Sequence, residues 1–262
     1  MNQIILSIIA NAGGVGKSTL ATHLAYDLAV RKKHSVALID LDPQRSLDVF
    51  CGLEPAEPAQ SITSVLSQDF KGEWPLATAW KIDKVSVCQG HQAIEQTART
   101  LVIHPRGHYS LSDRLKKYPL PHEVVIVDCP ATLGLLISNA LAAATHIIIP
   151  LQLEPKAVQG AADVIQWYIN QSLDLGLDPR PDLLGFVPSA YEAGTAMHRQ
   201  LLEQLPVLAE QLNTKMYPHI RNSKEFVNAS GQGLPLQIFR PGHKANDDFH
   251  EISNDLSRLI NG

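Results

Sequence analysis

Short apolar runs without polar alternation recur along the chain, and longer segments of helical periodicity separate them. The runs are Gln3–Ala10, Val36–Ile39, Val124–Val127, Ile147–Ile149 and Leu183–Val187. Strands that are buried on both faces have this continuous pattern. Helical patterns occupy 17–33, Leu133–Ala144, Ala157–Ile169 and Thr195–Leu212. The order strand, helix, strand predicts an α/β fold with a mostly parallel central sheet flanked by helices, in one domain over 1–262.

The stretch from Glu54 to Tyr118 has a weaker pattern, because several prolines interrupt it. We expect two weak strands there, Val85–Cys88 and Leu101–His104, together with short helices of the same domain. At the C-terminus, apolar residues recur at helical spacing over Phe249, Ile252, Leu256 and Leu259. The polar face of this segment is not basic enough for a membrane surface, so we expect the helix to pack on the domain.

Composition leaves room for a large core, since 45% of the 262 residues are hydrophobic and 18% are charged. The three cysteines lack CxxC spacing, which argues against a disulfide framework, a zinc site or an iron–sulfur cluster. No apolar run approaches the length of a membrane span, and the N-terminus has no basic leader, so we expect a cytoplasmic protein without membrane contact. The net charge of −4 requires any nucleic-acid surface to be local.

A glycine-rich segment, NAGGVGKS, lies between the first strand and the first helix. In a P-loop, backbone N–H groups and the helix N-terminus bind phosphate oxygens, a lysine reaches the β and γ phosphates, and a hydroxyl binds Mg²⁺. Asn11 stands in place of the first glycine of the GxxxxGK[ST] pattern. The predicted nucleotide-binding residues are Ala12, Gly13, Gly14, Val15, Gly16, Lys17, Ser18 and Thr19, with ATP and Mg²⁺ as cofactors.

Three aspartates follow predicted strands: Asp40 and Asp42 in LIDLDPQRS, and Asp128 in VVIVDCPATLG. The carboxyl ends of parallel strands meet at one edge of a sheet, so these carboxylates are expected to converge on the P-loop. Acids around Mg²⁺ hold its ordered waters, and an acid near the γ-phosphate orients the attacking water. A single strand-end aspartate is often only a turn residue, but three together favour an ATPase site.

These motifs resemble the deviant Walker A ATPases of the ParA and MinD type, and the resemblance spans nearly the whole chain. It implies a protein that dimerises face to face on ATP, hydrolyses ATP slowly, and changes its partner affinities with the nucleotide state. It implies that Lys17 is the phosphate lysine, Ser18 the Mg²⁺ ligand, Asp40 and Asp128 outer-shell Mg²⁺ acids, and Asp42 the water-orienting acid. By the same pattern, Pro188 and the region around Tyr217–Arg221 belong to the adenine pocket.

The family's box begins KGG, but Ala12 occupies the position of the signature lysine that crosses to the partner's nucleotide. In lacking this lysine, the chain resembles the carboxysome-positioning McdA subgroup, from whose box the lysine is also missing. A second explanation for the missing lysine is an inactive homologue. Such a protein would have no reason to keep the other site residues, which are Lys17, Asp40, Asp42 and Asp128. Two adjacent triphosphates need protein cations, and Lys156 follows the Ile147–Ile149 strand at the expected edge. We therefore predict that Lys156 is the catalytic replacement for this lysine and leave open whether it acts in cis or in trans. A plain surface lysine at a helix start has the same pattern.

The segment 211–244 contains five cations and one acid, a local charge of +4 in a chain of net charge −4. We expect a surface for nonspecific double-stranded DNA, doubled by ATP-dependent dimerisation. A solvated face of scattered cations is the alternative interpretation. The predicted DNA-binding residues are Lys215, Arg221, Lys224, Arg240 and Lys244.

The resulting prediction is a homodimeric, nucleoid-associated ATPase that positions a cargo such as carboxysomes. An McdB-like or ParB-like adaptor protein would stimulate its hydrolysis. A plasmid or chromosome partition ATPase is an alternative, as is a metabolic ligase or synthetase with the same P-loop fold. An iron–sulfur reductase of the same superfamily is disfavoured, because Cys129 has no convincing second cysteine.

Overall fold

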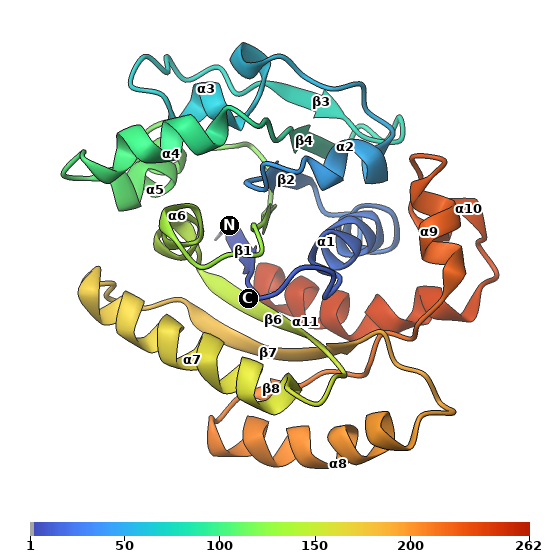
Figure 1. Cartoon of the computed structure of the whole chain (residues 1–262). Coiled ribbons are helices and arrows are strands. Elements are labelled where there is room, and N and C mark those ends of the chain that lie inside the picture. Colours follow the sequence, from blue (N-terminus) through green and yellow to red (C-terminus); the bar gives the residue numbers. More distant parts are fainter. Residues whose placement is uncertain (1–2) are drawn as a thin grey trace.

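An eight-stranded sheet forms the centre of the molecule, and helices cover both of its faces (Figure 1). The computed structural model describes residues 3–262. The strands are β1 Ile4–Ile8, β2 Val36–Asp40, β3 Leu76–Thr78, β4 Val85–Cys88, β5 Val124–Asp128, β6 His146–Gln152, β7 Asp182–Ser189 and β8 Lys215–Met216.

The strand order is β3-β4-β2-β5-β1-β6-β7-β8, and every neighbouring pair is parallel except β3 with β4. This confirms the predicted α/β class with a mostly parallel sheet. The helices are α1 Lys17–Tyr26, α2 Ser46–Cys51, α3 Ile62–Leu66, α4 Ile94–Val102, α5 Ser110–Lys117, α6 Leu135–Ala143, α7 Ala157–Asp174, α8 Ala196–Gln211, α9 Lys224–Ser230, α10 Leu236–Phe239 and α11 His250–Asn261. Shorter helical turns are η1 Asp27–Arg31, η2 Pro58–Gln60, η3 Gly107–Tyr109 and η4 Lys244–Phe249.

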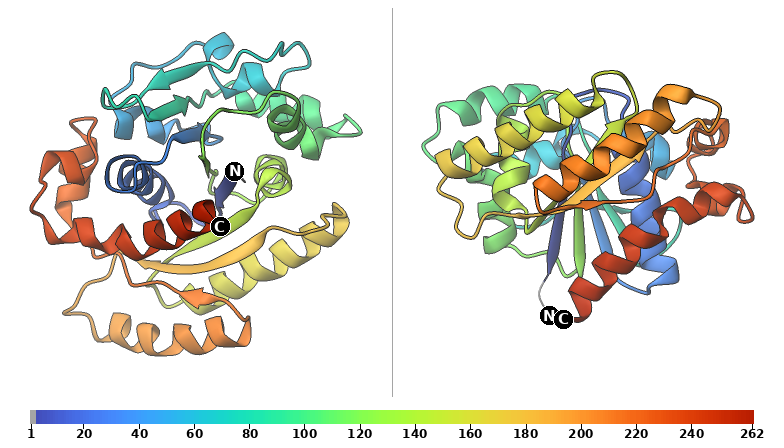
Figure 2. Two further views of the ribbon diagram at one scale, coloured as in Figure 1. Left: turned by 180° about the vertical axis from the view of Figure 1, so that it is seen from behind. Right: turned by 90° about the horizontal axis from the view of Figure 1, so that it is seen from below.

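Two apolar layers form because successive side chains of each strand point to opposite faces. Val36 and Leu38 of β2 belong to the apolar layer that contains residues of α1, α2 and α11, whereas Ala37 and Ile39 belong to the layer that contains residues of α3 to α8. Because both faces are covered, the strands carry continuous apolar runs rather than alternating ones. Figure 2 shows α11 crossing the sheet on the α1 side. Within residues 3–262 no helix combines the length and apolar character that a membrane crossing requires.

The predicted strand Leu101–His104 is wrong, because α4 continues to Val102 and a turn follows it. Leu101 is buried at the inner side of the helix, while Val102 and Ile103 are exposed, so the apolar run has no sheet partner. The C-terminal helix packs on the domain as predicted, with one change in its apolar stripe. Leu259 is 40% exposed and Ile260 is buried, since a spacing of four from Leu256 places Ile260 on the inner face.

Candidate nucleotide-binding site

The glycine-rich loop joins the carboxyl end of β1 to the start of α1, which is the arrangement that the sequence predicts. Its left-handed backbone angles fall at Gly14, with φ 74°, and at Gly16, with φ 88°, where a Cβ would be strained. Asn11 is not among the residues with positive φ. Asparagine in place of the first glycine therefore imposes no left-handed strain on this loop.

Lys17 is the first residue of α1, and only 7% of it is exposed. Its Nζ donates a hydrogen bond to the carbonyl oxygen of Ala12 at 2.9 Å, so the lysine is folded across its own loop. The loop is also braced from β7, because the buried Ser189 hydroxyl donates to the carbonyl of Val15 at 2.9 Å. Sequence reasoning missed Ser189, although its place directly after Pro188 at a strand end was a usable signal.

Asp40 and Asp128 end the adjacent strands β2 and β5, and the two residues are register partners. Both are fully buried. Asp40 Oδ1 accepts the Asp42 N–H at 2.9 Å, and Asp40 Oδ2 accepts the Leu47 N–H at 3.2 Å. Burial, with Asp128 as a nearby like charge, raises the pKa of Asp40 well above its ordinary value.

Asp128 has no hydrogen-bond partner for either carboxylate oxygen within the described residues. Burial raises the pKa of Asp128 to about 7, although the nearby Ser18 hydroxyl and Lys17 ammonium lower it. Two orphaned buried oxygens are costly unless another group satisfies them. The unsatisfied oxygens of Asp128 lie beside the Ser18 hydroxyl of the P-loop. Mg²⁺ prefers oxygen ligands and keeps several waters, so Ser18, Asp40 and Asp128 fit a hydrated Mg²⁺ ion.

Asp42 is half-buried near the start of the loop that follows β2, and its Oδ1 accepts the Gln44 N–H at 2.9 Å. Gly90, in the loop after β4, approaches this region closely. A Cβ on Gly90 would lie 2.9 Å from the Asp42 carbonyl oxygen and 3.0 Å from the Asp40 side-chain carbon. Gly90 is therefore a supporting residue that sequence reasoning missed; a glycine just after a strand was its only signal.

Lys156 lies at the N-terminal cap of α7 and is exposed. A cavity of about 340 Å³ lies between the P-loop and the start of α7, and it is lined by both Ala12 and Lys156. Lys156 and Ala12, which stands where the resemblance places the signature lysine, thus border the same cavity. Whether Lys156 reaches a partner's nucleotide stays a prediction.

The two expected adenine-pocket residues have different surroundings. Pro188 is buried at the end of β7, and its carbonyl accepts the Ile220 N–H at 2.7 Å. Tyr217 is only 3% exposed, and its hydroxyl donates to Asp255 on α11 at 3.2 Å. A side chain buried in this way is unsuited to stack on a base. An open cavity of about 530 Å³ lies further along these loops and is lined by Tyr191, Glu192, Ala193, His219, Arg221, Asn222, Ser223 and Lys224.

The cations of 211–244 do not form one unneutralised patch. Lys215 lies between Glu251 and Asp255 at 2.6 and 2.7 Å, Arg221 pairs with Asp248 at 2.6 Å, and Arg240 pairs with Glu225 at 2.9 Å. Lys224 and Lys244 are exposed and have no salt bridge within residues 3–262. The local charge of +4 is therefore reduced by acids from the following segment.

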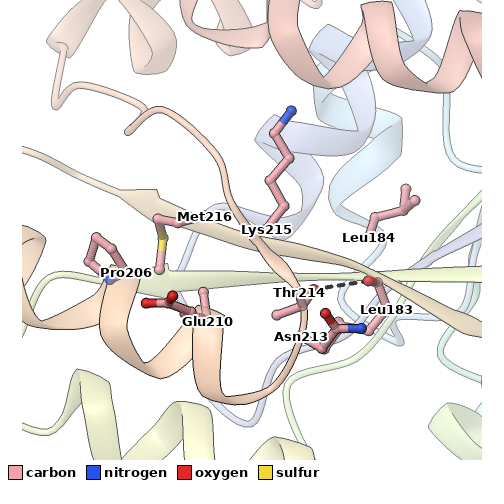
Figure 3. Close-up of a pocket in the computed structure, with 9 residues that line it drawn as sticks. Leu183, Leu184, Pro206, Glu210, Asn213, Thr214, Lys215 and Met216 are labelled. Carbon is pink, nitrogen blue, oxygen red and sulfur yellow. Dashed lines mark hydrogen bonds between the residues drawn. The ribbon is translucent and has the colours of Figure 1, made fainter.

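A further cavity of about 610 Å³ lies at the β8 edge of the sheet, between β7, β8 and α8 (Figure 3). Thr214 Oγ1 donates to the Leu183 carbonyl at 2.9 Å there. Lys215 points away from the other labelled residues, toward its acidic partners on α11. This leaves Glu210 as the one ionisable group directed toward the cavity among its described lining residues, so the space lacks the chemistry of the P-loop site.

Comparisons with known proteins agree with this geometry. A family model described as "AAA domain" matches residues 3–174. The chromosome partitioning protein ParA of Myxococcus xanthus (strain DK1622) is 28% identical over 204 residues, which cover 77% of this chain and 70% of that protein.

Two solved structures extend the comparison to nearly the whole chain. McdA of Cyanothece, solved as the ATP complex of a single-residue variant, has a TM-score of 0.85 at 20% identity and covers 97% of this chain and 96% of that one. At this identity the likeness shows the fold alone. Cobyrinic acid a,c-diamide synthase from Mycobacterium smegmatis, solved with an ATP analogue and magnesium, has a TM-score of 0.81 at 25% identity, over 100% of this chain and 97% of that one. Since the family model matches well over half of the residues, the chain belongs to the AAA-domain family, in its ParA/MinD group.

Proposed function

We propose that the chain is a Mg²⁺-dependent ATPase that dimerises face to face on ATP. The observation that carries this proposal is the pair of orphaned Asp128 oxygens beside Ser18 and Lys17. A bound Mg²⁺ would offset negative charge on the phosphates. Lys17 would exchange its bond to Ala12 for the β and γ phosphates, and the loop N–H groups would hold the same oxygens. Asp40 and Asp128 would accept hydrogen bonds from ordered waters, and Asp42 would orient the attacking water.

The wider role that we propose is positioning of a cargo such as carboxysomes on nonspecific nucleoid DNA. An adaptor protein of the McdB or ParB type would stimulate hydrolysis. Similarity to a chromosome partitioning protein supports transport on DNA. The McdA-like choice of cargo rests on Ala12 in the signature position and on Lys156 across the shared cavity. Of the five candidate DNA residues, Lys224 and Lys244 support the proposal best, because the other three are paired with carboxylates.

Two other functions stay open for the same site. A plasmid or chromosome partition ATPase would use the same nucleotide cycle with another cargo. A metabolic synthetase is favoured by the likeness to cobyrinic acid a,c-diamide synthase over the full chain. In that case a small substrate would receive the γ-phosphate, and turnover would rise with that substrate rather than with DNA and an adaptor.

Binding to a labelled duplex of arbitrary sequence separates the positioning and partition ATPases from the metabolic synthetase. Anisotropy would be measured at low salt with ATP, with ADP and without nucleotide, using wild type and the slowly hydrolysing Asp42→Ala variant. A positioning ATPase should bind the duplex about tenfold or more tightly with ATP, because dimerisation joins two contact surfaces. Equal affinity with ATP and ADP would eliminate the ATP-dependent DNA role and leave the ATPase assignment to be tested at Lys17.

A further inference from the structure

The edge of the sheet opposite the P-loop gathers lysines at the entry of three neighbouring strands. Lys32 and Lys33 precede β2, Lys81 and Lys84 precede β4, and Lys116 and Lys117 end α5, whose connection leads into β5. Because β4, β2 and β5 are adjacent and parallel, their amino ends lie at one edge. We call these six lysines the amino-edge lysines. Figure 2 (right) shows this end of the strands, where α11 also ends.

Backbone contacts hold the first two pairs together. The Lys84 ammonium donates to the carbonyl oxygen of Lys33, and the Val36 N–H donates to the Lys84 carbonyl at 2.8 Å. Lys33 and Lys81 have left-handed backbone angles, with φ of 68° and 57°, at the turns that carry them. Both side chains are exposed. The two loops therefore present their charges from one corner of the sheet.

The amino-edge lysines are not neutralised by salt bridges. In the described part of the chain, none of the six takes part in one. The neighbouring acids include Asp83, Glu123 and Asp113, the last of which pairs with Arg106 at 2.5 Å. Glu123 is already engaged, because it accepts the Ser35 N–H at 2.8 Å and contacts His34 Nδ1 at 2.9 Å. This distinguishes the amino edge from the segment 211–244, where three of the five cations have carboxylate partners.

We propose that the amino edge is a second DNA-contact surface, which binds the phosphate backbone without sequence preference and independently of nucleotide. Flexible ammonium groups act as point charges toward phosphates, and a row of them across adjacent strands suits an extended polyanion. The edge is remote from the P-loop, since parallel strands separate their amino and carboxyl ends. In a face-to-face ATP dimer the two amino edges would lie at the outer ends, so one dimer could contact two DNA segments.

The test compares duplex binding without nucleotide between about 50 and 200 mM salt. The double variant Lys33→Asn/Lys81→Asn removes two exposed charges, and asparagine tolerates their positive φ. Each lost phosphate contact should lower the slope of log affinity against log salt by about 0.9, so the expected decrease is about 1.8. The charge-retaining variant Lys33→Arg/Lys81→Arg should keep the wild-type slope and serves as the folding control. Arg99→Gln/Arg199→Gln, at two exposed helix positions, controls for the loss of net charge.

Three results would overturn the proposal. The first is absence of a wild-type complex at low salt without nucleotide. The second is an unchanged slope in the Lys33→Asn/Lys81→Asn variant. The third is stronger competition by polyglutamate than by duplex DNA at equal charge, which would assign the edge to an acidic protein. None of these depends on the gain in affinity with ATP, so the amino edge and the ATP-dependent function succeed or fail separately.

Discussion

Asp40 and Asp128 are register partners at the carboxyl ends of two adjacent parallel strands, and both are fully buried. The fold thus places two carboxylates side by side in the low-dielectric interior, with only Asp40 supplied with backbone hydrogen bonds. Such a pair is expensive without a compensating cation. Lys17, at the start of α1, is the protein cation that lowers the pKa of Asp128. The first prediction tests this arrangement.

Lys17→Ala should abolish tight ATP binding, whereas Asp42→Ala should retain ATP and accumulate the dimer. Removing a buried charged partner of phosphate costs about 2–5 kcal/mol, which corresponds to a roughly thirtyfold or greater loss of affinity. Asp42 is assigned to the attacking water, so its removal should slow hydrolysis without weakening binding. Titration calorimetry and light scattering measure the two effects. Unchanged ATP affinity in Lys17→Ala would refute the site assignment.

Gly90→Ala should reduce both stability and hydrolysis, because its Cβ would meet the Asp42 carbonyl at 2.9 Å. Overpacking against backbone costs about 1–3 kcal/mol, and here the displaced segment carries Asp40 and Asp42. Chemical denaturation and steady-state ATPase assays measure the two losses. Gly194→Ala is the matched control, since its Cβ would have no neighbour within 4 Å. Equal behaviour of the two variants would contradict the supporting role of Gly90.

The strands, the P-loop and the strand-end acids could be predicted because each depends on a local pattern. Continuous apolar runs report burial on both faces, and the glycines report left-handed angles within a few residues. The same reasoning misassigned Leu101–His104, because an apolar run at the end of an amphipathic helix has the composition of a strand. Only the positions of neighbouring elements show that Val102 and Ile103 face solvent.

Long-range pairing explains the remaining differences. The charge of 211–244 could be counted from the sequence. The ion pairs of Lys215 with Asp255 and of Arg221 with Asp248 form only in the folded chain. The burial of Tyr217 against α11 has the same origin. Ser189 contacts the P-loop over a sequence separation of 174 residues. Its place at a strand end could suggest a site residue, but the sequence does not show that its partner is Val15.

Lys224→Gln/Lys244→Gln should weaken DNA binding in the ATP state and lower its salt slope by about 1.8, since each phosphate contact contributes about 0.9. Both lysines are exposed and free of salt bridges in the described chain. Lys215→Gln removes a cation that two acids already neutralise, so it should leave the slope nearly unchanged. Anisotropy at several salt concentrations measures the slopes. Equal slopes for the two variants would exclude the C-terminal contact surface.

His23 should make the folded state less stable as the pH falls below 6.5. Burial lowers the pKa of His23 to about 4 from 6.5. Between these values the unfolded chain binds a proton that the folded chain excludes, so stability is present above pH 6.5 and decreases toward pH 4. From pH 6.5 to 5 this pKa difference lowers the free energy of unfolding by about 2 kcal/mol.

Urea denaturation of wild type and His23→Gln at several pH values isolates this contribution. In the folded protein His23 Nε2 accepts the Leu236 N–H at 3.1 Å, and glutamine offers an acceptor of similar reach. The variant should be less stable at pH 7.5 but lose about 2 kcal/mol less than wild type between pH 6.5 and 5. Parallel pH profiles would show that His23 does not titrate in this way.

Lys156→Ala should bind ATP normally but hydrolyse it slowly, if Lys156 supplies the positive charge of the signature lysine that is absent at position 12. Lys156 and Ala12 line the same cavity of about 340 Å³ beside the P-loop. Two triphosphates brought together by dimerisation need positive charge from the protein as well as from Mg²⁺. A cation at the N-terminal end of a helix opposes the helix dipole unless an anion lies nearby, so a phosphate partner would account for its placement.

Mixing Lys156→Ala with Asp42→Ala subunits determines whether the lysine acts in trans. In a mixed dimer, the Asp42→Ala subunit would lend its Lys156 to the site that keeps Asp42, so one of the two sites is complete. Random assortment makes half of the dimers mixed, and the expected rate is about a quarter of wild type per chain. A lysine acting in cis leaves neither site whole. ATPase activity no higher than that of the separate variants, with mixed dimers verified by affinity tags, would therefore exclude the trans role.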